Sequence, residues 1–582
     1  MYRCMTDRKF YSRYVGGELL ISIVYDIKRV VIPILVQFTN HFTVIHHEDH
    51  GIFLEDTNWF QEEGGRILFS TITSGTVCGI SSCLVQVEVD LSKGLPCFQM
   101  VGLLSSEVRE ARERVRVALK NSGITLPPMC INVNLSPADL RKEGTMLDLP
   151  VAVGILTCLG RLSKESTQRT VLLGELGLNG EIKPVRGVLP IVAKAKESGM
   201  RRCILPCDNA MEGAVVGDIE IIGVASVTET VAYLQGLEKG EEGLIEPKQI
   251  DVRSLWKERD GDRTPDFADI SGQETVKRAA EVAAAGFHHL LMIGPPGSGK
   301  TMLAKRIPSI LPPLSLQESL EVSTVYSVSG LLRSSEEVLI TRRPFLNPHH
   351  TITSQALAGG GRVPVPGIIS LSHRGVLFLD ELPEFRRETL DILRQPLEDR
   401  LIQIARSSGV YTFPADFMLV GAMNPCPCGH YPDMARCRCA PYEVRRYLGR
   451  VSGPILDRID ICVEVEALRF RDMIEKPAGE SSAQIRERVL AARKMQSDRF
   501  AGTKLRFNTD MGVADVEKYC KLEEKERNYM ERMFSVMRLS ARGYHRILKV
   551  ARTIADLEGS TGIREEHLAE AICYRYNGGQ DI

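Results

Sequence analysis

An apolar run that leads into a glycine-rich loop constrains the fold of this chain more than any other feature. The run His289–Ile293 predicts a buried strand, and the residues MLAKRIPSIL that follow the loop predict a helix. The loop itself consists of Gly294, Pro295, Pro296, Gly297, Ser298, Gly299, Lys300 and Thr301. Strand, loop and helix match the G-x-x-x-x-G-K-[ST] phosphate loop in the context that this motif requires. The sequence therefore predicts an α/β domain that binds ATP.

The residues of this loop have distinct chemical roles. The glycines let backbone N–H groups turn inward around the phosphates, and the helix that follows adds partial positive charge. We expect Lys300 to contact the β- and γ-phosphates and Thr301 to supply a hydroxyl ligand to Mg²⁺.

Two further apolar runs end in polar residues. The run Gly375–Leu379 predicts a buried parallel strand followed by Asp380 and Glu381. Asp380 can hold the Mg²⁺ shell and Glu381 can polarise the attacking water; the alternative is a strand that simply ends in two solvated acids. The run Phe417–Met423 ends at Asn424, which fits the polar residue that senses the γ-phosphate in ATPases of the AAA+ class.

Cysteines are concentrated directly after Asn424. Of the 15 cysteines, four lie within residues 426–439, namely Cys426, Cys428, Cys437 and Cys439. Four thiolates at this density can form a tetrahedral Zn²⁺ site, in which His430 could replace one thiolate. The alternative is a cysteine-rich loop without metal. The remaining cysteines are scattered, and we expect them to be reduced and buried in a cytoplasmic protein.

Bulk properties limit the possible partners. The length of 582 residues predicts three or four domains. The net charge of −1 gives the chain no overall basic field, so contact with nucleic acid must come from a local patch. The most apolar stretch, Leu19–Phe38, is interrupted by charges and a proline, and we expect no membrane span.

The chain divides into segments of different character. Residues 1–66 mix histidines, aromatics and charges without sustained periodicity; they are either a real extension or an artefact of an upstream start site. Glu62-Glu63-Gly64-Gly65 can be encoded by a run that resembles a ribosome-binding site, and Leu68 could be a UUG start codon. Residues 67–236 predict an α/β or α+β domain, with strand-like runs Val77–Val89, Cys130–Asn134 and Val171–Gly174. Residues 237–265 predict a linker, 266–470 an α/β core and 480–577 a helical domain.

Long local runs resemble one family. They include VGLLSSEVREARERVRVALKNSG, NLSPADLRKEGTMLDLPVAVGIL, FLNPHHTIT, ISLSHRGVLFLDELPEF, NPCPCG and SGPILDRIDICVEV, within residues 67–577. They are similar to the magnesium-chelatase-like AAA+ ATPases of the YifB/ComM family. The resemblance implies an AAA+ P-loop core with a helical lid, ATP and Mg²⁺ as cofactors, and a homo-oligomeric ring, expected to be a hexamer. It also implies an ATP-dependent branch-migration helicase that acts on DNA.

The resemblance assigns further residues. Arg458, in LDRID, matches the arginine that enters the neighbouring subunit's ATP site; the alternative is a salt bridge to Asp457 or Asp460. Arg542 matches the second sensor arginine on the lid, with Arg546 as the competing candidate. A zinc-bound cysteine cluster between Asn424 and Arg458 would stiffen the segment that joins one ATP site to the next.

Two segments are expected to line the pore of the ring. Residues 344–372 match the insertion in helix 2 of this branch of AAA+ proteins. The run Leu401–Phe413 predicts a hairpin with Arg406-Ser407-Ser408-Gly409 as its turn. His349 and His350 lie in the insertion, where we favour a structural or pore role over metal binding. Repetition of Arg406 around the ring would bind single-stranded or branched DNA without sequence preference.

The first domain resembles the ribosomal-protein-S5-like fold that it shares with the proteolytic domain of Lon. The runs Lys142–Asp148 and Gly180–Leu189 carry this resemblance. Lon-type proteolysis needs a serine and a lysine that activates it. Residues 145–150 contain no serine, the place of the lysine falls on Leu189, and Lys194 is too far along the chain. The resemblance therefore implies a scaffold or DNA-handling domain.

Three functions remain to be compared. The first is a DNA-remodelling motor, the second a chelatase-type motor that acts on a partner protein, and the third an ATP-dependent protease or chaperone of Lon type. The third lacks its nucleophile and base. The second lacks any recognisable metal-binding domain of the integrin type.

Overall fold

The computed structural model describes residues 9–15, 18–24, 43–48, 51–56, 68–142, 144–241, 244–252, 265–332, 338–406, 409–467 and 479–575, with side chains from Phe69 onward. The chain forms two compact units, Met1–Leu68 and Phe69–Ile582. The described residues of the first unit form two antiparallel hairpins, so part of this segment is strand although its sequence lacks sustained periodicity. These are β1 (Lys9–Val15) with β2 (Glu18–Val24), and β3 (Thr43–Glu48) with β4 (Gly51–Asp56). The possible ribosome-binding run, residues 62–65, lies outside the described residues.

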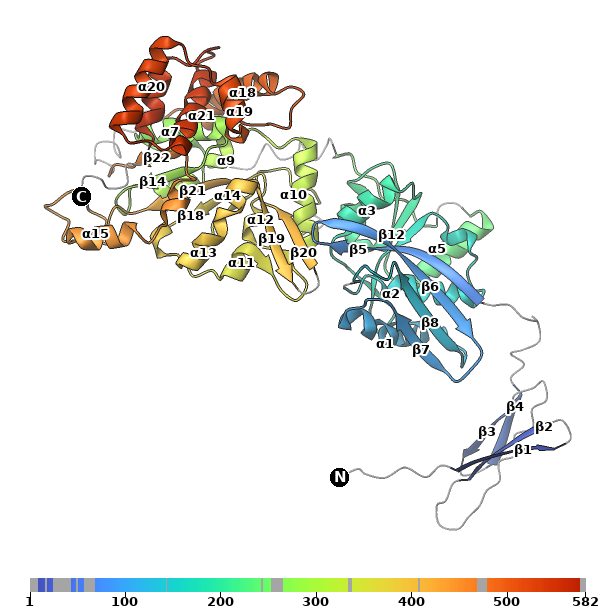
Figure 1. Cartoon of the computed structure of the whole chain (residues 1–582). Coiled ribbons are helices and arrows are strands. Elements are labelled where there is room, and N and C mark those ends of the chain that lie inside the picture. Colours follow the sequence, from blue (N-terminus) through green and yellow to red (C-terminus); the bar gives the residue numbers. More distant parts are fainter. Residues whose placement is uncertain are drawn as a thin grey trace. The chain divides into compact units, whose positions relative to one another are not determined.

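A mixed seven-stranded sheet organises residues 68–239 (Figure 1). The strand order is β13-β12-β9-β5-β6-β8-β7. The strands are β5 (Leu68–Cys78), β6 (Ser81–Ser92), β7 (Cys97–Val101), β8 (Cys130–Ser136), β9 (Thr170–Leu172), β12 (Arg202–Pro206) and β13 (Glu220–Val224). The prediction of one strand over Val77–Val89 is wrong, because the chain turns at Gly79 (φ +66°) and returns as β6. The predicted mixed α/β architecture is confirmed.

Five helices belong to this domain. They are α1 (Ser106–Asn121), α2 (Asp148–Cys158), α3 (Val188–Glu197), α4 (Cys207–Ala214) and α5 (Val227–Lys239), with the short elements η1 (Glu165–Thr167), β10 (Glu175–Leu176) and β11 (Ile182–Lys183). Every residue of α2 is buried. A methyl group on Gly154 would lie 2.7 Å from Val89 Cγ2, so glycine allows α2 to approach β6 closely.

One cysteine pair departs from the expected reduced state. Cys97 on β7 and Cys130 on β8 are disulfide-bonded. The two residues are partners in the parallel register of these strands. Neighbouring strands lie about 4.8 Å apart, which is within the range of Cα separations that a disulfide spans. Pairing across strands is not visible in the local sequence, and the prediction of reduced thiols is wrong for this pair.

A five-stranded parallel sheet forms the centre of the second domain. Its strands are β15 (Phe345–Leu346), β18 (Val376–Leu379), β21 (Met418–Met423), β14 (Leu290–Ile293) and β22 (Ile461–Glu464), in this spatial order. The strands β18 and β21 are buried along their whole length. Burial on both faces explains why these strands appear in the sequence as continuous apolar runs.

Helices cover the sheet on both sides, and several are short. The helical elements between residues 265 and 400 are η2 (Phe267–Asp269), α7 (Glu274–Gly286), α8 (Lys300–Ala304), α9 (Ile307–Ile310), α10 (Leu316–Ser329), α11 (Ser354–Ala358), α12 (Ile368–Leu371), η3 (Leu382–Glu384), α13 (Arg387–Asp391), η4 (Ile392–Arg394) and α14 (Pro396–Asp399). After the sheet's central strand follow α15 (Pro441–Leu448) and α16 (Gly453–Leu456). The single helix expected after the phosphate loop is divided into α8 and α9. Pro308 lacks the N–H that would bond to Ala304, so the helix cannot continue.

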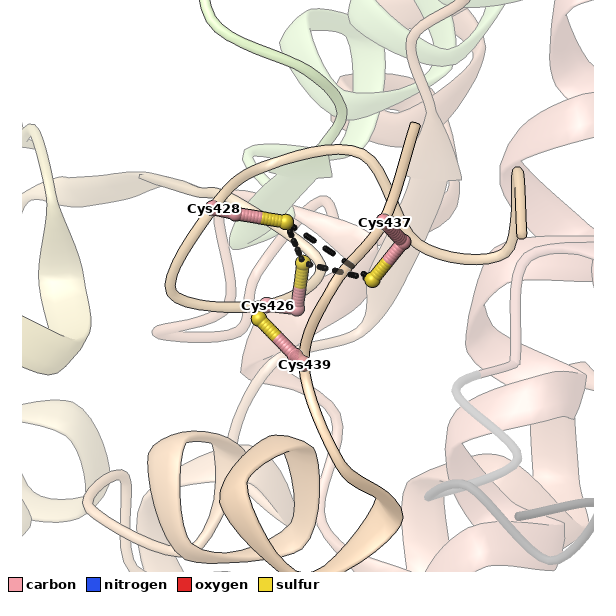
Figure 2. A group of neighbouring side chains, drawn as sticks. All are labelled: Cys426, Cys428, Cys437 and Cys439. Atoms are coloured by element: carbon pink, nitrogen blue, oxygen red, sulfur yellow. Dashed lines mark hydrogen bonds between the residues drawn. The ribbon is translucent and has the colours of Figure 1, made fainter. Parts of the chain in front are cut away.

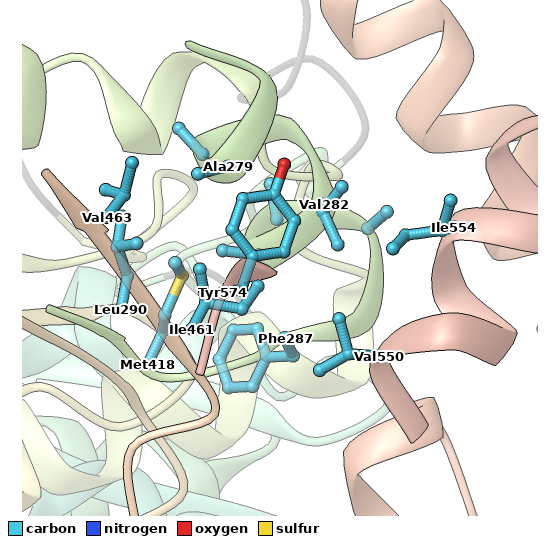
Figure 3. Packing of buried hydrophobic residues seen from close by; sticks show 14 of the residues in the cluster. Ala279, Val282, Phe287, Leu290, Met418, Ile461, Val463, Val550, Ile554 and Tyr574 are labelled. Carbon is cyan, nitrogen blue, oxygen red and sulfur yellow. The ribbon is translucent and has the colours of Figure 1, made fainter. Parts of the chain in front are cut away.

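The C-terminal segment is helical, as predicted. It contains α18 (Ser482–Arg499), η5 (Asn508–Asp510), α19 (Val513–Tyr519), α20 (Glu524–Val536), α21 (Ala541–Leu557) and α22 (Glu565–Cys573). Figure 3 shows Val550 and Ile554 of α21 facing Val282 of α7, next to the strand residues Leu290 and Ile461. The helices and the sheet therefore share one core.

Two hairpins extend the core domain. Strands β16 (Gly359–Gly360) and β17 (Val365–Pro366) pair within the predicted insertion, between α11 and α12. The predicted insertion, residues 344–372, is not wholly separate from the core, because Phe345–Leu346 forms the edge strand of the main sheet. The predicted hairpin at 401–413 is confirmed as β19 (Leu401–Arg406) with β20 (Gly409–Pro414). Its turn residues Ser407 and Ser408 lie outside the described part of the chain.

The predicted linker, residues 237–265, overlaps structured elements at its start. Helix α5 continues to Lys239, and Ile250 and Val252 pack against a small apolar cluster that contains Leu189 and Leu339. Residues 253–264 are not among those described. In the described ranges, no helix is both long and apolar enough to cross a membrane.

Candidate ATPase site

The phosphate loop leaves the carboxyl end of β14. Gly297 (φ +75°) and Gly299 (φ +88°) take left-handed backbone angles that favour glycine, and α8 begins at the next residue, Lys300. The Lys300 ammonium is enclosed by the loop and donates to the carbonyl oxygens of Gly294 at 2.7 Å and Pro295 at 2.8 Å. Burial lowers the pKa of Lys300, and the nearby Asp380 carboxylate opposes this shift. The loop therefore holds the Lys300 ammonium at a position where phosphate oxygens could replace these carbonyls as acceptors.

Thr301 and Asp380 meet at the same edge of the sheet. The Thr301 hydroxyl donates to Asp380 Oδ2 at 2.7 Å, and the backbone N–H of Glu381 donates to Asp380 Oδ1 at 2.9 Å. A hydroxyl and a carboxylate oxygen in contact are ligands of the kind that Mg²⁺ takes beside nucleotide phosphates. The two residues predicted to hold the metal are therefore adjacent.

Asn424 completes this group. Strand β21 lies between β18 and β14 in parallel register, so its carboxyl end opens beside both Asp380 and the phosphate loop. Asn424 follows β21, and its Oδ1 accepts from the Lys300 ammonium at 3.3 Å. Lys300, Asp380 and Asn424 thus leave three neighbouring strands at one edge.

Glu381 has a strained backbone and a histidine partner that the sequence did not reveal. Its φ of +51° lies in the left-handed region, and its side chain is 57% exposed. His350 Nδ1 lies 3.4 Å from Glu381 Oε2. The His350 ring lies 4.1 Å from the His349 ring at a tilt of 33° and meets Phe385 edge-on. Because His350 comes from the insertion, the insertion contacts the predicted catalytic carboxylate directly.

A pocket adjoins the loop on its apolar side. It is lined by Lys300 and by Ile270, Gln273, Val276, Met302 and Val465. Apolar walls beside a phosphate site suit a nucleotide base. No motif indicated this pocket, because its walls come from three segments that are far apart in the sequence.

Arg458 lies away from the phosphate loop of its own chain. It precedes β22, and therefore stands at the amino edge of the sheet, whereas Lys300 follows β14 at the carboxyl edge. Arg458 forms an ion pair with Glu398 and donates to the Pro454 carbonyl at 2.7 Å. In the part of the chain that the structure describes, neither Asp457 nor Asp460 pairs with Arg458.

Those two aspartates have other partners. Asp457 lies 3.8 Å from Arg575, and Asp460 pairs with His288 at 3.3 Å and Arg546 at 3.7 Å. His288, Arg546 and His289 hold the pKa of Asp460 far below its usual range against the effect of burial. Asp460 is therefore a structural anion at the amino edge.

Glu398 brings the two predicted arginines together. Arg542 Nη2 lies 3.1 Å from Glu398 Oε1, while Arg458 contacts the other oxygen. The arginine Arg458 is the main cause that lowers the pKa of Glu398. The competing Arg546 is 15% exposed and engaged with Asp460, whereas Arg542 is 52% exposed. Arg542 therefore lies beside Arg458 on the shared Glu398, whereas Arg546 is held by the structural anion Asp460.

The four clustered cysteines converge in space. Their sulfurs face one another (Figure 2), and one ligand atom from each lies within 4.8 Å of all the others. Cys426 and Cys437 are buried, and Cys428 and Cys439 are half-buried. Among the described residues, His430 is not part of this group.

Arg406 connects the two predicted pore elements. It ends β19 at the hairpin turn and donates through Nε to the carbonyl of Gly361 at 3.4 Å. Gly361 lies between β16 and β17 of the insertion. The two elements therefore touch at their tips.

The first domain has a buried polar group in the segment 142–148, one of the two runs that resemble Lon. Asp148 accepts from Arg114 Nε at 2.7 Å, and burial raises the pKa of Asp148 to about 6. The Thr145 hydroxyl donates to Glu175. Leu189 is buried, and its N–H donates to Glu212 at 3.1 Å. A buried leucine has no proton-accepting group, so this position has no general base.

Comparisons with known proteins identify the family of the chain. Three family models match: "Magnesium chelatase, subunit ChlI" over residues 266–473, "Subunit ChlI of Mg-chelatase" over 87–209, and "Magnesium chelatase, subunit ChlI C-terminal" over 479–575. The chain is 44% identical over 499 residues to competence protein ComM of Haemophilus influenzae, which covers 85% of this chain and 95% of that protein. It is 41% identical over 508 residues to the protein YifB of Escherichia coli, covering 87% and 97%.

A more distant match concerns part of the chain. Lon protease 2 of Bacillus subtilis is 26% identical over 170 residues, which is 26% of this chain and 30% of that protein. The extended matches cover both the phosphate loop and the segment that carries Arg458. The chain therefore belongs to the YifB/ComM family of magnesium-chelatase-like AAA+ ATPases.

Proposed function

We propose that the protein is an ATP-hydrolysing ring motor that remodels DNA, with branch migration as its activity. The observation that carries this proposal is the contact between the hairpin β19–β20 and the insertion hairpin β16–β17 through Arg406. One subunit thereby presents a basic side chain on two joined hairpins. A ring repeats this unit around its axis, which would turn a nearly neutral chain into a local band of positive charge.

Each residue of the ATP site has a role in this proposal. Lys300 neutralises phosphate charge, and Thr301 and Asp380 would hold Mg²⁺, which would supply charge neutralisation at the β- and γ-phosphates. Glu381 orients and polarises the attacking water, and Asn424 senses the γ-phosphate through the same cluster of contacts as Lys300. The Glu381 side chain is exposed, so it can contact a water above the phosphates.

The arginines support assembly into a ring, for which we propose six subunits. Arg458 and its own Lys300 lie at opposite edges of the sheet, so Arg458 suits the ATP site of a neighbouring copy. Arg542 lies beside it on Glu398 and suits the same neighbour. A guanidinium supplied by a second subunit stabilises transition-state charge on the transferred phosphoryl group. Hydrolysis would then require the assembled ring.

The first domain fits an S5-like scaffold more closely than a protease. Residues 145–150 contain no serine, and Leu189 packs with Leu339 in an apolar cluster that joins α3 to the ATPase segment. The N–H of Leu189 also faces Ser327 of α10 at 3.3 Å. The position that a Lon-type lysine would occupy is thus used for packing between the domains. We also propose that the C-terminal helices α18–α22, which share the core of the ATPase sheet, form the lid of the AAA+ core.

A chelatase-type motor that acts on a partner protein is the second candidate. The matched family models carry the chelatase name, and a 67 kDa magnesium-chelatase subunit of Heliobacterium mobile is 28% identical over 186 residues. This candidate does not need Arg406 in a pore.

We place the motor in the cytoplasm, where ATP, Mg²⁺ and DNA are present together. The four cysteines beside the ATP site fit a structural Zn²⁺.

ATP turnover in the presence of DNA separates the two candidates. We expect single-stranded and forked DNA to stimulate hydrolysis without sequence preference, and we expect this effect to fall steeply with salt. Arg406→Ala should lose most of the stimulation while it keeps basal turnover. The matched control is Arg564→Ala, an exposed arginine on the C-terminal helices. Absence of DNA binding by assembled rings at low salt, with a non-hydrolysable ATP analogue bound, would favour the chelatase-type motor.

A further inference from the structure

The cysteine cluster lies in contact with the phosphate loop. Gly429 follows Cys428 directly, and a methyl group on its Cα would lie 2.4 Å from Cδ and 2.9 Å from Cγ of Pro296. Gly429 has a φ of +81°, and its N–H donates to the Cys426 carbonyl at 3.0 Å. The tight turn that carries the first two cysteines therefore rests against the second proline of the loop.

The sulfur positions match a tetrahedral metal site. Cys426 Sγ lies 3.4 Å from Cys428 Sγ and 3.8 Å from Cys437 Sγ, and the last two sulfurs are 3.6 Å apart. A tetrahedron with zinc–sulfur bonds of about 2.3 Å has sulfur–sulfur edges of about 3.8 Å. Disulfide bonds would bring sulfurs to about 2.05 Å. The backbone N–H of Tyr431 donates to Cys426 Sγ at 3.4 Å, as outer-shell donors do at thiolate ligands.

Apart from the cysteines, the segment is held mainly by local turn hydrogen bonds, such as that from the Cys437 N–H to the Asp433 carbonyl at 2.7 Å. Residues 425–439 contain no helix or strand. Apart from the cysteines, the apolar side chains that pack on the cluster are Val444, Tyr431 and Leu448. Met434, at the tip, is 73% exposed. A segment with so little buried apolar surface opens easily unless another cross-link holds it.

We propose that the four cysteines bind one Zn²⁺, and that this ion holds Gly429 against Pro296 so that zinc occupancy sets the nucleotide affinity of the phosphate loop. Metal binding then fixes a segment that contacts the loop at two points, Gly429 on Pro296 and Asn424 on Lys300. Four thiolates select zinc over Mg²⁺, which takes oxygen ligands. The inference rests on the proposed ATPase activity and adds a regulatory ion to it.

Metal content tests the site itself. The full chain, purified without chelator, should contain about one zinc per chain by mass spectrometry of its metals. Zinc below about 0.2 per chain, or iron in its place, overturns the assignment.

Nucleotide binding tests the coupling. Removal of zinc from the wild-type protein with a chelator should weaken binding of fluorescent ADP about tenfold, or ~1.4 kcal/mol, and added ZnCl₂ should restore it. An unchanged dissociation constant after complete zinc loss overturns the coupling. If the zinc-loaded wild type binds no nucleotide at all, the proposed ATPase function fails instead, so the two failures are distinct.

A glycine variant tests the contact without removing a ligand. Gly429→Ala keeps all four cysteines but places a methyl group into Pro296, and we expect full zinc content with weakened nucleotide binding. Gly502→Ala is the matched control, because Gly502 has a similar φ of +78° and no atom within 4 Å of the added methyl. Equal nucleotide affinity in the two variants, both carrying zinc, overturns the proposed contact.

Discussion

Replacing Arg458 with alanine tests whether this arginine serves the ATP site of a neighbouring subunit. Strands β14 and β22 pair in parallel from Leu290↔Ile461 to Ile293↔Glu464. Three residue steps at ~3.3 Å separate the two edges of the sheet by about 10 Å, before the phosphate loop and the turn at Arg458 extend the separation further. Arg458 is also held at its own edge by Glu398. It therefore cannot contact the γ-phosphate bound by its own Lys300.

The magnitude of the effect follows from the charge that Arg458 would supply. An arginine supplied by a neighbouring subunit raises the rate of phosphoryl transfer by a factor of about 10³ or more, which lowers the barrier by ~4 kcal/mol. We expect Arg458→Ala to lower kcat by about this factor, with ATP affinity changed less than about twofold because the binding groups remain. Steady-state ATP turnover and equilibrium binding of fluorescent ATP measure the two quantities separately.

Mixed rings decide between action within one subunit and action across the interface. In an equal random mixture of Arg458→Ala and Lys300→Ala chains, about one quarter of the interfaces pair an intact phosphate loop with an intact Arg458. Turnover should therefore recover to roughly a quarter of the wild-type rate when the interfaces act independently. Arg564→Ala should behave as wild type. Verified mixed rings that recover no activity would refute the assignment of Arg458 to the neighbouring site.

Three further variants test other parts of the structure. Glu381→Gln should bind ATP normally and lose about 10²–10⁴ in kcat, since the general base is removed while the phosphate contacts remain; near wild-type turnover would contradict the role. Asp556→Ala should lose about 3–5 kcal/mol of stability, measured by urea unfolding. The substitution leaves the buried Arg552 without its carboxylate partner, since Arg552 Nη2 lies 3.1 Å from Asp556 Oδ1. A loss below about 1 kcal/mol would contradict the argument. Contacts with His373 and Arg374 lower the pKa of Glu321 to about 2. This stabilisation is present above the unfolded pKa of 4.5 and is lost as the pH falls toward 2, so the urea midpoint should drop more between pH 5 and 3 than in Glu321→Gln.

The arrangement of the ATP site was largely predictable because it follows from strand ends. Lys300, Asp380 and Asn424 each follow a short apolar run, and the carboxyl ends of parallel strands meet at one edge of the sheet. The family resemblance assigned roles to Arg458 and Arg542 by matching motifs, and these roles stay predictions. The run Leu401–Phe413 and its turn residues also predicted the hairpin that carries Arg406.

Pairings through space were not predictable from the sequence. Glu398 is 60 residues from Arg458, and no local pattern links the two. His350 meets Glu381 only because the insertion folds back on the sheet edge. The two departures from the predicted secondary structure have local causes, namely the left-handed turn at Gly79 and the missing N–H of Pro308.

The connection between β21 and β22 explains why the cysteines follow Asn424. Both strands run parallel, so the chain must leave the carboxyl edge after Asn424 and return to the amino edge before β22 begins. On this path it contacts the phosphate loop at Gly429, forms α15 and ends at Arg458, which pairs with Glu398. A cross-link near the start of the path limits how far nucleotide-dependent movement at Asn424 is absorbed within the connection. We therefore expect the state of one ATP site to change the position of Arg458, and through it the adjoining site, more strongly when the four cysteines hold their metal.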